Sequence, residues 1–119
     1  KWGVRNRPPY PLDKTGKSDT IVTKTIKGHT APSKRDEPDS VVDHVTSDGS
    51  VKTRAFYDGD GWKVKEIHTT DHGNPKHHSY GRHGEHVHYY EWDHETGKQI
   101  SNKQEEIPPD LRKENDDIL

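Results

Sequence analysis

The chain has no cysteine and no methionine. Without thiols it can form neither disulfides nor the four-cysteine sites that hold structural zinc. This absence fits an intracellular protein, and equally one that unfolds and refolds while it is delivered across a membrane. Because methionine is missing even from position 1, we expect the chain to be the carboxy-terminal part of a longer protein.

Long apolar runs are also missing. No stretch approaches the roughly 18 residues that a membrane span needs, and no signal-peptide core is visible, so we expect no membrane partner. Hydrophobic residues make up 24% of the chain, and with the ten glycines added the fraction stays below the roughly 45–50% of typical globular domains. Three Trp and five Tyr can still bury large areas, which predicts a thin core of modest stability.

The 119 residues suffice for one small domain. Residues 1–39 are rich in Pro, Lys, Thr and Asp, and within them only Thr20–Lys27 (TIVTKTIK) alternates as a strand does. This composition is typical of a linker. We therefore predict a linker-like segment at residues 1–39 with one strand at 20–27, followed by a histidine-rich β domain at residues 40–119.

The region after residue 40 shows a succession of β-hairpin signals. Turns that favour positive φ are expected at Asp48-Gly49, at Asp58–Gly61 and near Gly97. They separate predicted strands at 41–45, 51–57, 62–69, 85–93 and 98–101. The tail after Pro108 predicts a short helix with Leu111 packing inward. The expected fold is mainly β (α+β): a small antiparallel sheet of four to six strands from consecutive hairpins, one short C-terminal helix and an irregular N-terminal segment.

The strand at 62–69 does not alternate strictly. Trp62 and Val64 share one face, whereas Ile67 would point to the other. Either the buried face switches along this strand, or a β-bulge falls near Lys65-Glu66.

Histidine is concentrated in one segment: seven of the ten histidines lie between His68 and His88. Histidine exchanges protons near neutral pH and is the commonest metal ligand, so this segment is where we expect chemistry. The isolated His29, His44 and His94 are interpreted as ordinary surface residues.

One reading of the segment is a metal site. His86 and His88 are two residues apart on a predicted strand, so both project from one face together with Tyr90 and Trp92, while Val87 takes the other face. His68, at the end of the preceding strand, is a third candidate ligand, and Asp71 and Glu85 offer carboxylates. Nitrogen and oxygen donors suit zinc, manganese or nickel. The alternative is that the two-residue spacing reflects ordinary strand alternation and that these histidines are surface residues that bind no metal.

A second reading needs no metal. Cleavage of RNA by its own 2′-hydroxyl requires a base, an acid and cations that stabilise the transition state. Two histidines with lysine or arginine supply these groups, and tyrosine rings can stack on unpaired bases. The candidate catalytic residues are His68, His72, His86, His88 and Asp71, and the candidate substrate-binding residues are Lys76, Arg82, Lys65 and Tyr90.

The segment Asp71–Lys76 (DHGNPK) is more specific than its neighbours. An Asp beside a His can fix a tautomer or the orientation of a partner, and Gly-Asn-Pro forces a defined turn. Lys76 is then placed to meet an anion. A capped surface turn without function remains the alternative.

The motifs YDGDG, KEIHTTDHGNPKHH, YGRHGEHVHYYEW and RKENDDIL resemble a small histidine-rich domain at the carboxy-terminal ends of larger proteins. The carriers are phage head-morphogenesis (minor capsid) proteins and polymorphic, Rhs-like toxins of Gram-positive bacteria and their phages. The resemblance covers roughly residues 51–119. It implies a detachable effector module acting in the bacterial cytoplasm of a producing or target cell, with a cognate immunity protein as a further partner.

From these observations we expect a toxin-like ribonuclease module that uses histidine acid–base catalysis on RNA without a cofactor. The first alternative is a metal-dependent hydrolase or nuclease that binds one divalent transition metal such as zinc through His68, His86 and His88. The second alternative is a non-enzymatic phage structural or partner-binding appendage.

Overall fold

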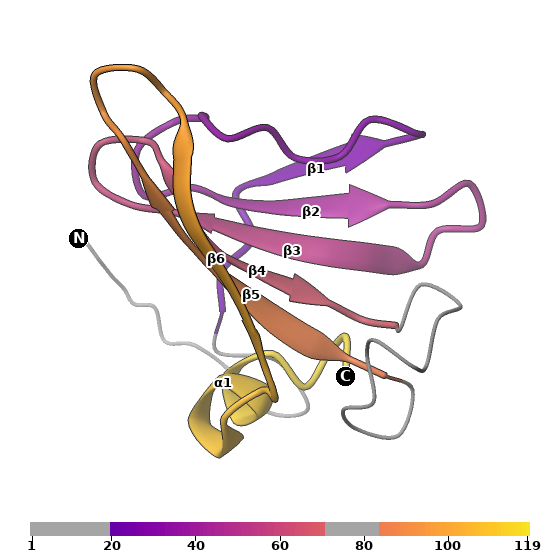
Figure 1. Cartoon of the computed structure of the whole chain (residues 1–119). Helices are drawn as coiled ribbons and strands as arrows, with labels where there is room; N and C mark the ends of the chain where they lie inside the picture. Colours follow the sequence, from indigo (N-terminus) through magenta and orange to yellow (C-terminus); the bar gives the residue numbers. More distant parts are fainter. Residues whose placement is uncertain (1–19, 71–83) are drawn as a thin grey trace.

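The computed structural model describes residues 20–70 and 84–119, which form a six-stranded mixed sheet and one short helix (Figure 1). The strands lie in the sheet in chain order, so every neighbouring pair is consecutive in sequence. The prediction of a mainly β fold with one short C-terminal helix is confirmed. The elements are β1 Lys24–Lys27, β2 Val41–Val45, β3 Val51–Tyr57, β4 Lys63–His68, β5 His86–Trp92, β6 Gln99–Glu105 and α1 Pro109–Glu114.

The first strand departs from the prediction in length and direction. β1 occupies only the second half of the predicted strand at 20–27, and it pairs with β2 in parallel. The expectation of a wholly antiparallel sheet was therefore wrong at this edge. Parallel neighbours need a connection of about a dozen residues or more, and residues 28–40 provide one. The other four pairings are antiparallel, as expected.

A β-bulge interrupts the pairing of β3 with β4. Phe56 pairs with Lys65 but Tyr57 pairs with Lys63, which leaves Val64 as the extra residue. This resolves the irregular alternation of the strand in favour of a bulge, one residue before the predicted position. Because of it, the side chains of Lys63 and Glu66 meet on one face although their spacing is odd, with Nζ 3.4 Å from Oε1.

One face of the sheet, here called the helix face, carries the apolar core. Ile67 and Val87 are fully buried there against Ile107 and Leu111, with Phe56 and Tyr89 packed at the border. The prediction that Leu111 packs inward is confirmed. In Figure 1 α1 lies at the end of β6, where it covers this core. No helix in the described ranges is long and apolar enough to cross a membrane.

The opposite face, here called the histidine face, has a second small core at β2 and β3. Val42, Ala55 and Tyr57 are buried there, with Ile26 of β1 against them. The segment between β1 and β2 contacts this face, because the Tyr57 hydroxyl donates to the carbonyl of Ser33 at 2.6 Å and Lys63 Nζ donates to that of Pro32 at 3.2 Å. The division of the chain at residue 39 stays a prediction.

The Asp58–Gly61 segment forms the hairpin turn between β3 and β4, as predicted. The Asp58 carboxylate accepts the backbone N–H groups of Asp60 and Trp62, both at 2.9 Å. Gly61 has φ +85°, and a Cβ at this position would collide with the backbone carbonyl of Asp36. Glycine is therefore required here for both conformation and space.

A buried arginine joins the sheet to the C-terminal residues. Arg54, 1% exposed, donates from Nε and Nη2 to the Asp43 carboxylate at 2.7 and 2.9 Å. Its Nη1 also donates to Asn115 and Asp117, which follow α1, at 3.0 and 2.9 Å. Because Asp43 is also buried, removing the charge of either side chain would leave the other charge buried without its counter-charge, which destabilises the fold.

We expect Arg54→Leu to lower the free energy of unfolding by about 3–5 kcal/mol, because it leaves the Asp43 carboxylate buried without its counter-charge. Urea denaturation followed by tryptophan fluorescence measures the change. The control is Asp117→Asn, which alters the same network at a side chain that is 37% exposed and is expected to cost about 1 kcal/mol or less. Equal losses in the two variants would contradict this account of Arg54.

Candidate functional site

Three histidines meet on the histidine face where β4 ends and β5 begins. The pairing of these strands places His68 opposite His86 and Glu66 opposite His88. The ring centroids of the three histidines lie 4.6–4.9 Å apart. One ring nitrogen from each lies within 4.8 Å of the others, and within residues 20–70 and 84–119 this is the group whose geometry suits a metal ion.

The three rings differ in exposure. His86 is fully buried, the His68 side chain is 15% exposed, and His88 is partly buried. The cluster therefore lies at the border of the protein interior, where ions and small molecules can reach two of its members.

Each ring of the cluster donates one N–H to a different oxygen. His68 Nε2 lies 3.1 Å from the Glu66 carboxylate, His86 Nδ1 lies 2.8 Å from the carbonyl of Gly84, and His88 Nδ1 lies 2.9 Å from the side-chain oxygen of Asn102. These oxygens accept hydrogen bonds, so in the neutral imidazoles the lone pairs are on His68 Nδ1, His86 Nε2 and His88 Nε2. Such outer hydrogen bonds are a regular feature of histidines that bind metals.

The donor set fits zinc. Three neutral imidazoles leave a fourth tetrahedral position for water, which is the arrangement of catalytic rather than structural zinc sites. Nitrogens bound to one zinc at about 2.1 Å in tetrahedral geometry are about 3.4 Å apart. The observed separations of up to 4.8 Å are therefore close enough for small side-chain rotations to close the site.

Glu66 connects the cluster to two other side chains. Its Oε1 accepts from His68, from the Tyr90 hydroxyl at 3.1 Å and from Lys63 at 3.4 Å. Burial opposes its ionisation, but the hydrogen bond from His68, the charge of Lys63 and the hydrogen bond from Tyr90 outweigh this and lower its pKa to about 2. Burial, together with the nearby carboxylate, raises the pKa of Tyr90, which therefore keeps its proton. Glu66 is thus a permanent anion behind His68.

Aromatic rings continue from the cluster along β5. His88 stacks with Tyr90 at 6.0 Å between centroids, and Tyr90 stacks with Trp92 at 5.8 Å. The prediction that His86, His88, Tyr90 and Trp92 share one face agrees with these contacts. Val87 is buried in the core of the helix face.

The structure brings four predicted site residues together: His68, His86, His88 and Tyr90. It places Lys65 elsewhere, with Nζ 4.6 Å from the centre of the Phe56 ring on the helix face. The carboxylate of Glu85 is also directed away from the cluster, because Arg112 of α1 donates to it at 3.2 Å. The remaining predicted site residues lie outside the described part of the chain: Asp71, His72, Lys76 and Arg82.

The isolated histidines are not all surface residues. His29 and His94 are exposed, but His44 is 3% exposed and its Nε2 lies 2.6 Å from the carbonyl of Gly28. The interpretation of His44 as a surface residue was wrong because the crossover between β1 and β2 covers it.

Two residues of the site were missed from sequence, Glu66 and Asn102. The signal for Glu66 was its two-residue spacing from His68, which places both on one face of β4. Asn102 gave no such signal, since its position beside His88 depends on the register of β5 with β6.

Comparison with known proteins gives no further assignment. No family model matches the chain, and neither the curated proteins nor the solved structures searched contain a match. The argument about function therefore depends on the site itself.

We expect the contribution of Glu66 to stability to disappear in acid. Its folded-state pKa of about 2 is below the ordinary 4.5, so the ionised form stabilises the folded protein above pH 4.5, and this contribution falls as the pH drops from 4.5 towards 2. At pH 7 the contribution is on the order of 3 kcal/mol. Urea denaturation of Glu66→Gln and wild type between pH 7 and pH 3 measures it.

The matched control for this experiment is Glu95→Gln, at an exposed position in the β5–β6 turn, which is expected to leave stability unchanged throughout. A constant difference between Glu66→Gln and wild type from pH 7 to pH 3 would contradict the assigned role of Glu66.

Proposed function

We propose that His68, His86 and His88 bind one divalent transition metal, zinc in the first instance, and that the protein is a metal-dependent hydrolase of phosphodiesters. The observation that carries the proposal is that one ring nitrogen from each of the three imidazoles lies within 4.8 Å of the others, while each ring also has a hydrogen bond to a separate oxygen. This was the first alternative from sequence, and the geometry of the cluster favours it over the metal-free reading.

A metal-free ribonuclease fits this geometry less well. Its acid and its base must act on opposite sides of the phosphorus atom, each within hydrogen-bond reach of a substrate oxygen. Here the three rings lie side by side, and His86 is fully buried. Such an arrangement surrounds one small ion more readily than a phosphodiester.

In the proposed reaction, water adds across a phosphorus–oxygen bond. The water oxygen bonds to phosphorus, the bond to the leaving oxygen breaks, one water proton passes to that leaving oxygen, and the second is released to solvent. A divalent ion held by three histidines supplies a water of lowered pKa for this step. The histidines orient the ion, and Glu66 and Asn102 hold His68 and His88 in the binding tautomers.

The choice of a phosphodiester depends on the resemblance to effector modules of Rhs-like toxins and phage head proteins, with RNA as the substrate expected first. We retain from that resemblance the proposal of a carboxy-terminal effector module with a cognate immunity protein. Experiments can test the RNA substrate and the immunity protein separately from metal binding.

Metal binding is tested with tag-free protein and isothermal titration of zinc. We expect one ion per chain, with a 10–100-fold loss of affinity in Glu66→Gln, where the oxygen acceptor behind His68 is weakened. His88→Ala is expected to remove the site, and His29→Ala, at an exposed histidine outside the cluster, serves as the control. Cobalt(II) bound to the wild type should show the visible absorption of a four-coordinate ion. Equal zinc affinity in wild type and His88→Ala would refute the site.

Hydrolysis is tested on single-stranded RNA with metal-loaded protein, with the same protein after chelation, and with His88→Ala. We expect cleavage by the loaded wild type only, because the ion supplies the attacking water. Cleavage that persists in EDTA would instead support the metal-free histidine ribonuclease. One bound ion without any cleavage of RNA or DNA would support the non-enzymatic appendage.

A further inference from the structure

The crossover between β1 and β2 is bound to the sheet through residues 32–36, here called the strap. Three consecutive carbonyl groups of the strap each accept one hydrogen bond: Pro32 from Lys63 Nζ at 3.2 Å, Ser33 from the Tyr57 hydroxyl at 2.6 Å, and Lys34 from the Lys63 N–H at 2.9 Å. The strap therefore holds Lys63, the first residue of β4, through both its main chain and its side chain.

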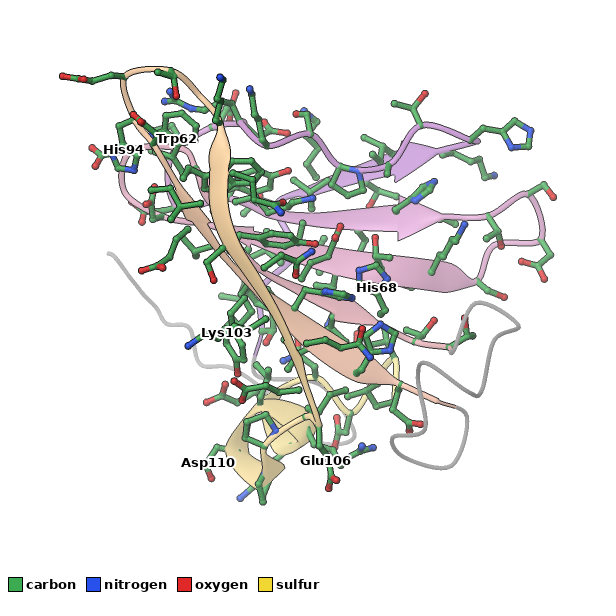
Figure 2. The ribbon with its side chains drawn as sticks, viewed as in Figure 1. Trp62, His68, His94, Lys103, Glu106 and Asp110 are labelled. Carbon is green, nitrogen blue, oxygen red and sulfur yellow. The ribbon has the colours of Figure 1, made fainter. Side chains whose placement is uncertain are left out.

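Lys63 also contacts the network of the histidine cluster. Its Nζ lies 3.4 Å from Oε1 of Glu66, and the same oxygen accepts from His68 at 3.1 Å. Figure 2 shows Trp62, the residue before β4, well apart from His68 at the end of this strand. A continuous series of contacts thus runs along β4 from the strap to a candidate metal ligand.

The two charges in this series are shielded from water. The side chains of Lys63 and Glu66 are only 11% and 5% exposed. Buried charges interact strongly, and removing one partner leaves the other in an unfavourable environment. Lys63 therefore stabilises Glu66 in the position where it accepts from His68. The other contacts of the ammonium group are the Tyr90 ring, at 4.9 Å, and the strap carbonyl of Pro32.

We infer that Lys63 is a positioning residue of the metal site and that docking of the strap raises the affinity of this site for its ion. The inference rests on the proposed binding of a metal by His68, His86 and His88, and adds how that binding is controlled. Displacement of the strap would lower the metal affinity. Because coupling between two sites is reciprocal, the bound ion would in turn stabilise the docked strap.

The first test is isothermal titration of zinc into variants of the full chain. We expect Lys63→Met, which removes the ammonium group, to lower the affinity about 10-fold, as the loss of an outer contact does. Lys63→Arg keeps the cation and is expected to stay within about 3-fold of wild type. Lys103→Met, at an exposed lysine of β6, is the matched control and should bind zinc as wild type does.

A double-mutant cycle shows whether Lys63 acts through Glu66. In a Glu66→Gln background we expect Lys63→Met to change the zinc affinity by less than about 2-fold, because the carboxylate on which Lys63 acts is already absent. An equally large loss in both backgrounds would overturn the positioning role, since a general weakening of the fold would produce it without Glu66.

The second test follows the strap by amide hydrogen exchange and begins with wild type, which needs no substitution. The Asp36 N–H donates to the carbonyl of Gly61 at 3.0 Å, so its exchange reports opening of the strap. We expect saturating zinc to slow this exchange about 10-fold, the factor by which the docked strap raises the affinity. Tyr57→Phe, which removes one bond to the strap, should speed the exchange and weaken zinc binding together. Tyr89→Phe, on the helix face, is its control.

The Gly97 N–H, which donates to Asp93 in the β5–β6 turn, is the internal reference for exchange. Zinc that slows Asp36 no more than Gly97 would overturn the inference, and so would unchanged zinc affinity in Lys63→Met. Either result, with zinc bound to wild type, leaves the metal site in place. Wild type that binds no zinc would reject the metal site and this inference together. Zinc binding without hydrolysis would reject the hydrolase, while the affinity and exchange results would still decide the role of Lys63.

Discussion

The pairing of β4 with β5 is the constraint on which the site depends. It places His68 across from His86 and Glu66 across from His88, so that three imidazoles and a carboxylate from two strands share one face. A slip by one residue would transfer all the side chains of one strand to the other face, and the cluster would be lost. The same register buries Ile67 beside Val87 on the helix face. The apolar core and the polar cluster therefore stabilise the same pairing.

The two faces of the sheet carry different kinds of side chain. The helix face combines a small apolar core with the Arg54 network, which joins β2 and β3 to the residues after α1. The histidine face carries the polar groups: a buried anion, three imidazoles and a row of aromatic rings. In a chain with only 24% hydrophobic residues, charged and aromatic side chains replace part of a conventional core. The side chains that stabilise this face are thus also those available for chemistry.

The sequence predicted the features that depend on local pattern. The strand at 51–57, the turn at 58–61 and the two-residue spacing of His86 and His88 follow from alternation and glycine placement, and all were correctly placed. Features that depend on pairing between distant segments were not accessible. The parallel direction of β1 follows from a crossover whose path local pattern does not fix. The burial of His44 follows from that crossover, and the contact of Asn102 with His88 follows from a bulged pairing of β5 with β6.

The bulge at Val64 divides β4 into two parts with different structural tolerance. Beyond it, towards His68, Glu66 pairs with Ala55 on one side and with His88 on the other, so inserting or deleting a residue there would move His68 out of the cluster. Before it, the turn and the start of the strand can absorb a change of length at the extra residue, as bulges generally allow. A change of length at the aromatic end of the sheet would therefore leave the spacing of Glu66, His68, His86 and His88 unchanged. The two ends of one strand pair thus differ in how far the length of the chain can change without moving the histidine cluster.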